Sequence, residues 1–268
     1  MKKIEHLSDI YKNYDTFIID LWGVMHNGIK LNKSATNAVD NLINNKKKVF
    51  FLSNAPRPKE SVIKFLREIN MDEKYLEHVI TSGQTAMESL NKNKFGKNFF
   101  HLGPERDECL FKGLEENKTE LNNCDFILCT GLFDEYTEDL NYYKSLFKNY
   151  IDKPLVCTNP DLIVHKGESM KFCAGKIAEV FESMGGKVVY FGKPYKEVYK
   201  TILKINEKNL VIGDNLNTDI KGANNLKLDS LFISGGVHKE EFNNEAGLVS
   251  LSKKYNVKIN FYQKNLTW

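Results

Sequence analysis

Five side chains in this sequence have the chemistry that moving a phosphoryl group requires. Asp20 offers a carboxylate, Ser53 a hydroxyl and Lys193 an ammonium group, and two further acids, Asp214 and Asp219, lie five residues apart. Phosphoryl transfer needs a nucleophile, cations that neutralise the equatorial oxygens, and neutral donors that orient them. Because hard oxygen ligands suit Mg²⁺, the set indicates phosphoryl transfer with Mg²⁺ as cofactor.

Short buried strands must position these side chains. Apolar runs rich in β-branched and aromatic residues alternate with amphipathic stretches, which predicts an α/β fold with a doubly wound parallel sheet. Ligands bind such sheets outside the carboxyl ends of the strands, and all five residues except Asp219 end or follow a predicted strand. One strand-end aspartate alone would more often be a helix N-cap. The predicted strands comprise residues 16–22, 48–53, 78–81, 98–102, 125–130, 154–158, 187–192, 209–213 and 230–234.

Composition and charge exclude several classes of protein. Hydrophobic residues make up 41% and aromatic residues 12% of the 268 residues, which predicts a folded chain. The net charge is only +3 and there are three arginines, so no nucleic-acid partner is expected. No window of 18 apolar residues and no signal-like apolar stretch at the start is present, so we expect a cytoplasmic protein with no membrane partner. The five cysteines form no C-x-x-C pair, and reduced thiols are expected.

Four short motifs, in order, resemble those of a known superfamily. DLWGV (20–24), FLSN (51–54), FGKP (191–194) and GDNLNTD (213–219) resemble motifs I to IV of the haloacid dehalogenase-like hydrolases. The last motif, together with TNPD (158–161), is similar to class IIA of that superfamily, which includes nitrophenyl and pyridoxal phosphatases. The resemblance spans about residues 16–235 and implies a Rossmann-like core. It also implies a hydrolase that removes phosphate from a small phosphorylated metabolite through an aspartyl-phosphate intermediate.

The resemblance assigns roles by motif position. Asp20 would attack phosphorus, which splits the hydrolysis into two steps. Ser53, with help from Asn54, would hold a phosphoryl oxygen, and Lys193 would neutralise the charge that builds up. Mg²⁺ would be bound by Asp20, the backbone carbonyl of Trp22 and Asp214. Asp219 would be a further ligand or a partner of one.

The spacing between motifs predicts a second domain. Asp20 and Ser53 are 33 residues apart and Lys193 and Asp214 are 21 apart, as one helix and a crossover require, but 140 residues separate Ser53 from Lys193. About 100 residues in excess of an ordinary crossover is the size of a small domain. We therefore expect a core at 1–82 and 189–268 and an inserted smaller α/β cap at 83–188. Class IIA relatives carry their cap at this point, and such caps often pair, so a homodimer through the cap is a possible assembly.

The stretch TNPDLIVHKGE (158–168) is the best candidate for cap residues that bind the substrate. By resemblance, Asn159 and Asp161 would face the active site, and His165 lies just beyond them. The sequence N-P-D is also good turn chemistry. A turn and a substrate-binding loop are therefore equally supported here.

One position departs from the superfamily pattern. Most of its phosphatases have a second aspartate two residues after the nucleophile, which protonates the leaving oxygen and later activates water, whereas this chain has Trp22. An indole has no proton to give near pH 7, and the loss of acid–base help typically costs about 10² to 10⁴ in rate. A class IIA subgroup with D-x-W-G-V-x-H resembles this chain. His26 could supply the proton instead, because an imidazole titrates near neutrality.

Four other functions compete with a phosphatase. A P-loop is excluded because Met170 stands where its first glycine is required, and a Rossmann dehydrogenase because no G-x-G-x-x-G follows the first strand. A catalytically weak or inactive phospho-ligand-binding protein of the same fold is supported by Trp22 alone. A phosphotransferase or phosphonatase, which handles leaving-group protonation differently, also stays open.

Overall fold

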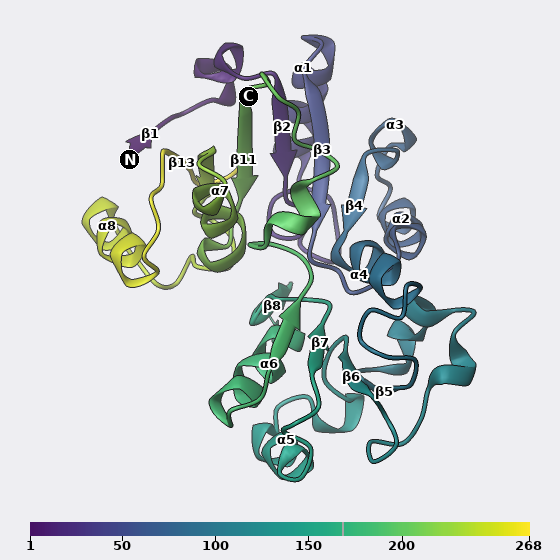
Figure 1. Cartoon of the computed structure of the whole chain (residues 1–268). Coiled ribbons are helices and arrows are strands. Elements are labelled where there is room, and N and C mark those ends of the chain that lie inside the picture. Colours follow the sequence, from purple (N-terminus) through teal and green to yellow (C-terminus); the bar gives the residue numbers. More distant parts are fainter. Residues whose placement is uncertain (168) are drawn as a thin grey trace.

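The computed structural model describes residues 1–167 and 169–268, and its larger sheet forms the upper body in Figure 1. This sheet has seven strands in the order β1-β13-β12-β11-β2-β3-β4, each parallel to its neighbours. At its centre Ile19 of β2 pairs with Ile212 of β11, so these two strands end side by side. The strands are β1 (Lys2–Lys3), β2 (Thr16–Ile19), β3 (Lys48–Ser53), β4 (Val79–Thr81), β11 (Asn209–Gly213), β12 (Asp229–Ile233) and β13 (Phe261–Gln263).

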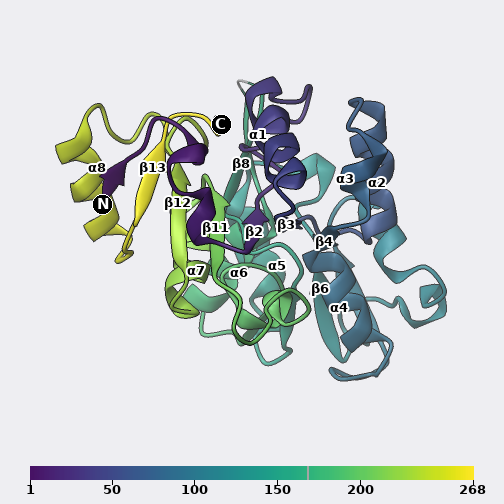
Figure 2. The same ribbon diagram turned by 90° about the horizontal axis from the view of Figure 1, so that it is seen from above.

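Helices cover both faces of the larger sheet (Figure 2). Side chains of a strand alternate between faces. Accordingly Phe17 and Ile19 of β2 belong to the apolar cluster that includes α1 and α2, whereas Ile18 packs in the cluster of α7. Burial on both faces fixes the central strand ends in place. These helices are α1 (Lys33–Asn44), α2 (Lys59–Glu68), α3 (Glu73–Leu76), α7 (Lys221–Asn225) and α8 (Glu245–Lys254). Helix α4 (Ser82–Leu90) follows β4, but its Ala86 and Leu90 pack in a separate cluster with Phe99 and Phe126.

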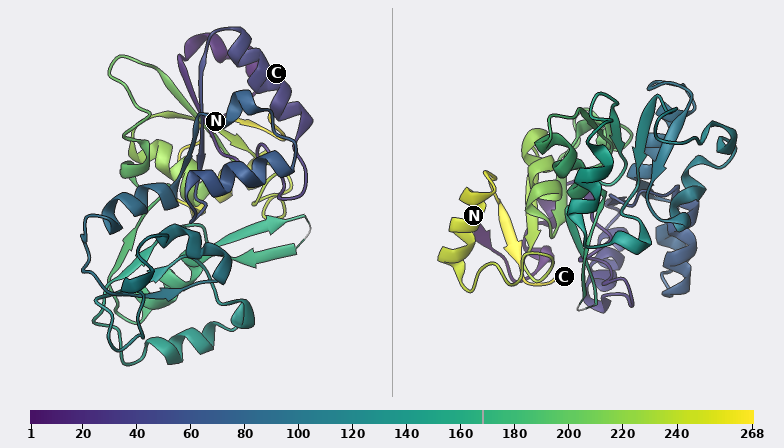
Figure 3. Two further views of the ribbon diagram at one scale, coloured as in Figure 1. Left: turned by 90° about the vertical axis from the view of Figure 1, so that its right-hand side faces the viewer. Right: turned by 90° about the horizontal axis from the view of Figure 1, so that it is seen from below.

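A second, smaller sheet lies below the first in Figure 1. Its four parallel strands run in the order β10-β7-β6-β5, with bounds β5 (Phe99–Leu102), β6 (Phe126–Cys129), β7 (Leu155–Cys157) and β10 (Val188–Tyr190). Helices α5 (Leu140–Phe147) and α6 (Ala174–Ser183) bury aromatic side chains against it. An antiparallel hairpin of β8 (Ile163–Lys166) and β9 (Ser169–Phe172) reaches out beside it (Figure 3).

These sheets confirm the predicted α/β fold with parallel strands. The smaller sheet lies within the stretch expected to form the cap, with one exception. β10 pairs with β7, and Phe191 packs beside strands of the smaller sheet, so a boundary between residues 188 and 189 would cut through a cap strand. Lys193 therefore follows a strand of the smaller sheet, not one of the core strands as the sequence suggested. We propose that the inserted domain extends to about residue 191.

Short helical turns complete the described fold. A π-helical turn, Leu216–Ile220, follows β11 directly. The 3-10 turns cover Leu7–Asp9, Tyr11–Asn13, Glu105–Phe111, Glu115–Asn117, Asp134–Tyr136 and Lys196–Tyr199. Among the described residues, no helix combines the length and the apolar character needed to cross a membrane.

Candidate active site

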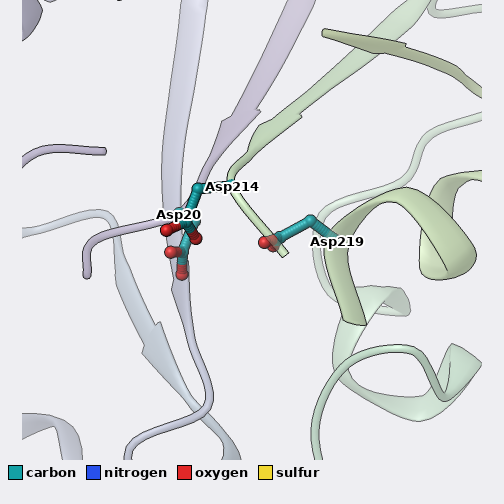
Figure 4. Close-up of side chains that lie close together, drawn as sticks. All are labelled: Asp20, Asp214 and Asp219. Carbon is teal, nitrogen blue, oxygen red and sulfur yellow. The ribbon is translucent and has the colours of Figure 1, made fainter. Parts of the chain in front are cut away.

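Three aspartates meet at the carboxyl end of the central strands (Figure 4). Asp20 follows β2, Asp214 follows β11, and Asp219 lies on the π-helical turn after β11. One carboxylate oxygen of each lies within 4.8 Å of the others, and all three side chains are buried. Because β2 and β11 are neighbours in register, their ends bring Asp20 and Asp214 together without any long connection.

Lys193 joins this group from the strand β10 of the smaller sheet. Its Nζ donates to Asp20 Oδ1 at 2.5 Å and to Asp219 Oδ1 at 2.7 Å. The side chain of Asn54 fixes the lysine backbone, because Asn54 Oδ1 accepts from Lys193 N at 2.7 Å and Asn54 Nδ2 donates to Lys193 O at 3.2 Å. Lys193 is only 2% exposed. A charge-assisted contact of this kind in a buried place is strong and holds both carboxylates in fixed positions.

Two glycines allow the backbone to approach Asp214 closely. A Cβ on Gly23 would lie 2.0 Å from Asp214 Oδ2, and one on Gly236 would lie 2.1 Å from the same oxygen. Gly23 also has a φ of +85°, which favours glycine. The amide of Val237 donates to Asp214 Oδ2 at 2.7 Å. Asp214 is thus held by a backbone donor, while Asp20 and Asp219 are held by the lysine.

Burial dominates the electrostatics of this cluster. It raises the pKa of Asp214 to about 8, helped by the charge of Asp219. Burial and the charges of Asp219 and Asp214 also raise the pKa of Asp20 against the opposing effect of Lys193. Burial alone would lower the pKa of Lys193, but the charges of Asp20 and Asp219 outweigh it and raise that pKa well above its usual range. The carboxylates are therefore short of positive charge.

The donor set fits a divalent cation of the Mg²⁺ type. Three buried carboxylates converge on one ammonium group, and Asp214 accepts no hydrogen bond from that lysine. Hard oxygen donors without a cysteine or histidine among them are what Mg²⁺ prefers. A cation here would also relieve the repulsion among the acids.

The aspartates line a cavity of about 250 Å³ between the two sheets. Ser53 and Asn54 line its wall from the end of β3, and Ser53 Oγ accepts from the amide of Ala55 at 3.2 Å. Asp161 lines the cavity from the smaller domain and accepts from Asn54 Nδ2 at 3.1 Å. Burial raises the pKa of Asp161 to about 6. Four carboxylates, the ammonium group of Lys193, the hydroxyl of Ser53 and the amide of Asn54 therefore surround one space.

Comparison with known proteins places this arrangement in a family. A family model described as haloacid dehalogenase-like hydrolase matches residues 17–116, and a second, HAD-hydrolase-like model matches residues 190–250. Together they cover more than half of the chain and contain all of the buried cluster. The chain belongs to the haloacid dehalogenase-like hydrolases.

Relatives of this hydrolase agree with that assignment. An acid sugar phosphatase of Staphylococcus haemolyticus is 27% identical over 267 residues, which is 95% of this chain and 98% of the relative. A haloacid dehalogenase-like family hydrolase from Brucella suis 1330 has a TM-score of 0.86 at 28% identity, over 98% of this chain and 100% of that one. A 4-nitrophenylphosphatase from Thermotoga maritima shares the fold, with a TM-score of 0.70 at 23% identity over 96% of each chain. The predictions of this superfamily and of a phosphatase are confirmed.

The cap residues predicted to bind substrate divide into two groups. Asp161 and His165 line the cavity of the hydrolase. Asn159 is not among the lining residues, and its Oδ1 accepts from the amide of Asp161 at 3.1 Å. It thus shapes the turn that presents Asp161, and its contact with the substrate stays a prediction. Glu168, the last residue of the predicted stretch, lies outside the described residues.

Trp22 and His26 take positions that the sequence did not reveal. Trp22 lines the cavity, whereas His26 does not. The His26 ring lies edge-on to Trp22 at 5.0 Å and to Phe65 at 5.4 Å, and its Nδ1 accepts from the amide of Gly28 at 3.0 Å. Burial lowers the pKa of His26 to about 4. These contacts do not favour the expected proton shuttle, so we leave His26 out of the proposed mechanism.

Sequence reasoning missed a support of the aspartate cluster. His238 received no role from the sequence, yet its Nε2 accepts from the amide of Leu216 at 3.1 Å, just after the Asp214 strand. Its Nδ1 lies 2.5 Å from Glu241 Oε1. An imidazole that accepts at Nε2 must carry its proton on Nδ1, which suits the glutamate. The sequence signal was weak, since only its position after Gly235 and Gly236, in the turn that follows β12, marks His238.

Proposed function

We propose that this hydrolase removes phosphate from a small phosphorylated metabolite, with Mg²⁺ as cofactor and an aspartyl-phosphate intermediate. The observation that carries the proposal is the contact of Lys193 with both Asp20 and Asp219 at the floor of the cavity. This contact supports the proposal because the carboxylate of Asp20 lies beside a buried ammonium group, in a space that Ser53 and Asn54 also line. Because similar chains are named acid sugar phosphatases, sugar phosphates are the substrate class we propose first.

The chain's own residues account for the first step. Asp20 attacks phosphorus with the oxygen that Lys193 does not hold, and the bond from phosphorus to the ester oxygen breaks. Lys193 then neutralises the charge on the transferring group, while Ser53 and Asn54 donate to its oxygens. Asp20, Asp214 and the Trp22 carbonyl would bind Mg²⁺, with Asp219 as a further ligand or a partner of one. When bound, the ion would offset the repulsion between the carboxylate and the phosphate.

Protons must come from water in this proposal. Trp22 has no acid–base group, and His26 points its Nδ1 at a backbone amide. A second water attacks the aspartyl phosphate and restores Asp20, with inorganic phosphate as the product. The absence of a dedicated acid predicts modest rates for poor leaving groups, since general acid–base help is worth about 10² to 10⁴. Slow turnover by a protein whose main role is to bind a phosphorylated ligand is the second candidate, and Trp22 is the observation that favours it.

The partner, the location and the assembly of the enzyme are also proposals. A small phosphorylated metabolite is the only partner the site calls for, and such substrates fit the cytoplasmic location expected from the sequence. A homodimer through the smaller domain is a further prediction, which sedimentation or light scattering would test.

A panel assay tests the proposed function. Phosphate release from sugar phosphates and other phosphorylated metabolites is measured with Mg²⁺ and with a chelator. We expect Mg²⁺-dependent release from at least one sugar phosphate, and release at background level for Asp20→Asn. Asp152→Asn is the matched control, because Asp152 is an exposed aspartate of the smaller domain. Wild-type rates in Asp20→Asn would overturn the proposal, and tight binding of a phosphorylated ligand without turnover would favour the second candidate.

A further inference from the structure

The side chain of Trp22 joins the two domains. Its indole Nε1 donates to the backbone carbonyl of His165, on β8 of the hairpin, at 2.7 Å. A second bond lies beside it, from the amide of Gly167 to the carbonyl of Asn27 at 3.1 Å. Both bonds run between the loop after β2 and the β8–β9 hairpin. This part of the core loop, residues 22–28, therefore contacts the tip side of the hairpin.

The indole is held firmly on its own side. Gly28 lies against the ring, where a Cβ would approach Trp22 Cζ2 to 2.4 Å, and its φ of +81° favours glycine as well. The ring of Phe65, on α2, is stacked with the Trp22 ring, with the ring centroids 6.4 Å apart and an angle of 13° between the ring planes. His26 contacts the indole edge and accepts from the Gly28 amide. The tryptophan, histidine and glycine of this loop thus form one unit that aims the indole N–H.

Other hydrogen bonds between the two parts of the chain involve different residues. Ser82 Oγ donates to the carbonyl of Thr158 at 2.5 Å, and Asn54 Nδ2 donates to Asp161 Oδ1 at 3.1 Å. The hairpin instead lines the cavity with Ile163, Val164 and His165 while its side chains stay partly exposed. Figure 3 shows the hairpin extending from the smaller domain.

We propose that Trp22 is a positioning residue that holds the β8–β9 hairpin over the cavity through its indole N–H. The indole of Trp22 orients the hairpin, which forms the roof of the cavity, and takes no part in proton transfer. The kinetic consequence rests on the proposed function. Because the hairpin contacts the substrate side of the cavity and not Asp20, loss of the bond should raise KM more than it lowers kcat.

Trp22→Phe tests the proposal, because it keeps an aromatic ring and removes the N–H. Amide hydrogen exchange of the peptide that spans β8 and β9 should become about fivefold faster, the factor for one hydrogen bond worth about 1 kcal/mol. Trp268→Phe is the matched control, since Trp268 is the other tryptophan of the chain and packs on Tyr11. Its hairpin should exchange as in the wild type. Unchanged exchange in a folded Trp22→Phe protein would overturn the proposal.

A second variant leaves Trp22 in place. Ile163 and Phe172 are paired across the hairpin, so residues 164–171 can be replaced by two glycines that close a short turn. In the Trp268→Phe background, Trp22 is then the sole tryptophan, and its fluorescence should shift to the red because the indole loses its cover and its acceptor. An unshifted spectrum would contradict the proposal even if Trp22→Phe fails to fold.

Kinetics separates this inference from the proposed function. We expect about a fivefold higher KM in Trp22→Phe for the best sugar phosphate, with a smaller loss in kcat. A fall in kcat with unchanged KM would contradict a role in positioning the hairpin. If the wild type releases no phosphate, the proposed function fails, while the exchange and fluorescence measurements still decide the role of Trp22.

Discussion

The floor and the roof of the cavity are built in different ways. On the floor, Lys193 contacts both Asp20 and Asp219 through charged side chains that are at most 9% exposed. The roof is the partly exposed β8–β9 hairpin, which is tied to the core by two hydrogen bonds to backbone carbonyls. Contacts between side chains fix residue identity, whereas contacts to the backbone leave the hairpin side chains free to differ. The floor thus suits a constant chemistry and the roof a variable substrate.

The largest effect is expected when Lys193, on the floor of the cavity, is replaced. In Lys193→Met the carboxylates of Asp20 and Asp219 lose their partner while they stay buried, so the free energy of unfolding should fall by about 3–5 kcal/mol and turnover by about 10² to 10³. Chemical denaturation and phosphate release measure the two effects. Lys239→Met is the control, because Lys239 lines the cavity near its mouth with a side chain that is 48% exposed. Equal losses in both variants would end the distinction between floor and mouth.

His26, which packs against Trp22, should make the free energy of unfolding depend on pH. Burial lowers the pKa of His26 from about 6.5 to about 4. Between these values the unfolded chain binds the extra proton, so the free energy of unfolding rises with pH. The stabilisation is complete above about pH 6.5 and is lost as the pH falls toward 4, up to about 3 kcal/mol. Melting temperatures of His26→Gln should change less over this range than those of wild type, and the exposed His6→Gln should behave as wild type.

The His26→Gln variant also tests whether His26 supports Trp22 or transfers protons. If His26 only supports Trp22, the pH–rate profile near neutrality should keep its shape in His26→Gln. A lost ionisation in that profile would restore the shuttle predicted from the sequence.

Binding of Mg²⁺ should stabilise the floor without any substrate. At about 100 times its Kd, a ligand of the folded state adds about 2.7 kcal/mol, so millimolar Mg²⁺ should raise the melting temperature. Asp214→Asn removes one of the converging carboxylates and should abolish most of the shift. Asp229→Asn, which changes a partly buried aspartate on the neighbouring strand β12, is the control. A full shift in Asp214→Asn would place the cation elsewhere.

The smallest effect concerns the loop that holds Asp214. His238→Leu removes the acceptor for the Leu216 amide, and we expect the Mg²⁺ concentration for half-maximal activity to rise about tenfold, since partners of metal ligands typically cost that much. His238→Gln can still accept from the amide and donate to Glu241, so it should recover most of the loss. Equal behaviour of the two variants would reduce His238 to a packing residue.

The same division explains what could be predicted from the sequence. The floor was predictable because buried parallel strands appear as apolar runs, and their ends meet at one edge of a sheet. Asp20, Ser53 and Asp214 therefore lie where the pattern placed them, at the ends of β2, β3 and β11. Lys193 lies beside them but follows β10, a strand of the smaller sheet. Motif spacing alone does not show which of the two sheets the strand before Lys193 belongs to.

The roof was less predictable because its contacts depend on three-dimensional packing. Nothing in the order of residues shows that Trp22 donates to a carbonyl 143 residues later. The hairpin was missed because β8 and β9 are short and partly exposed, so they lack the continuous apolar run of a buried strand. His26 is a similar case: its type suggests proton transfer, but the sequence does not show that its ring packs edge-on to those of Trp22 and Phe65.

The central claim is that Asp20 becomes covalently phosphorylated during turnover. The most direct measurement is an acid quench of the enzyme during turnover of its best sugar phosphate with Mg²⁺, followed by mass spectrometry of the peptide that contains Asp20. We predict a phosphoryl group on Asp20 in the wild type and none in Asp20→Asn. Phosphate release by an enzyme that never carries phosphate on this peptide would contradict the account.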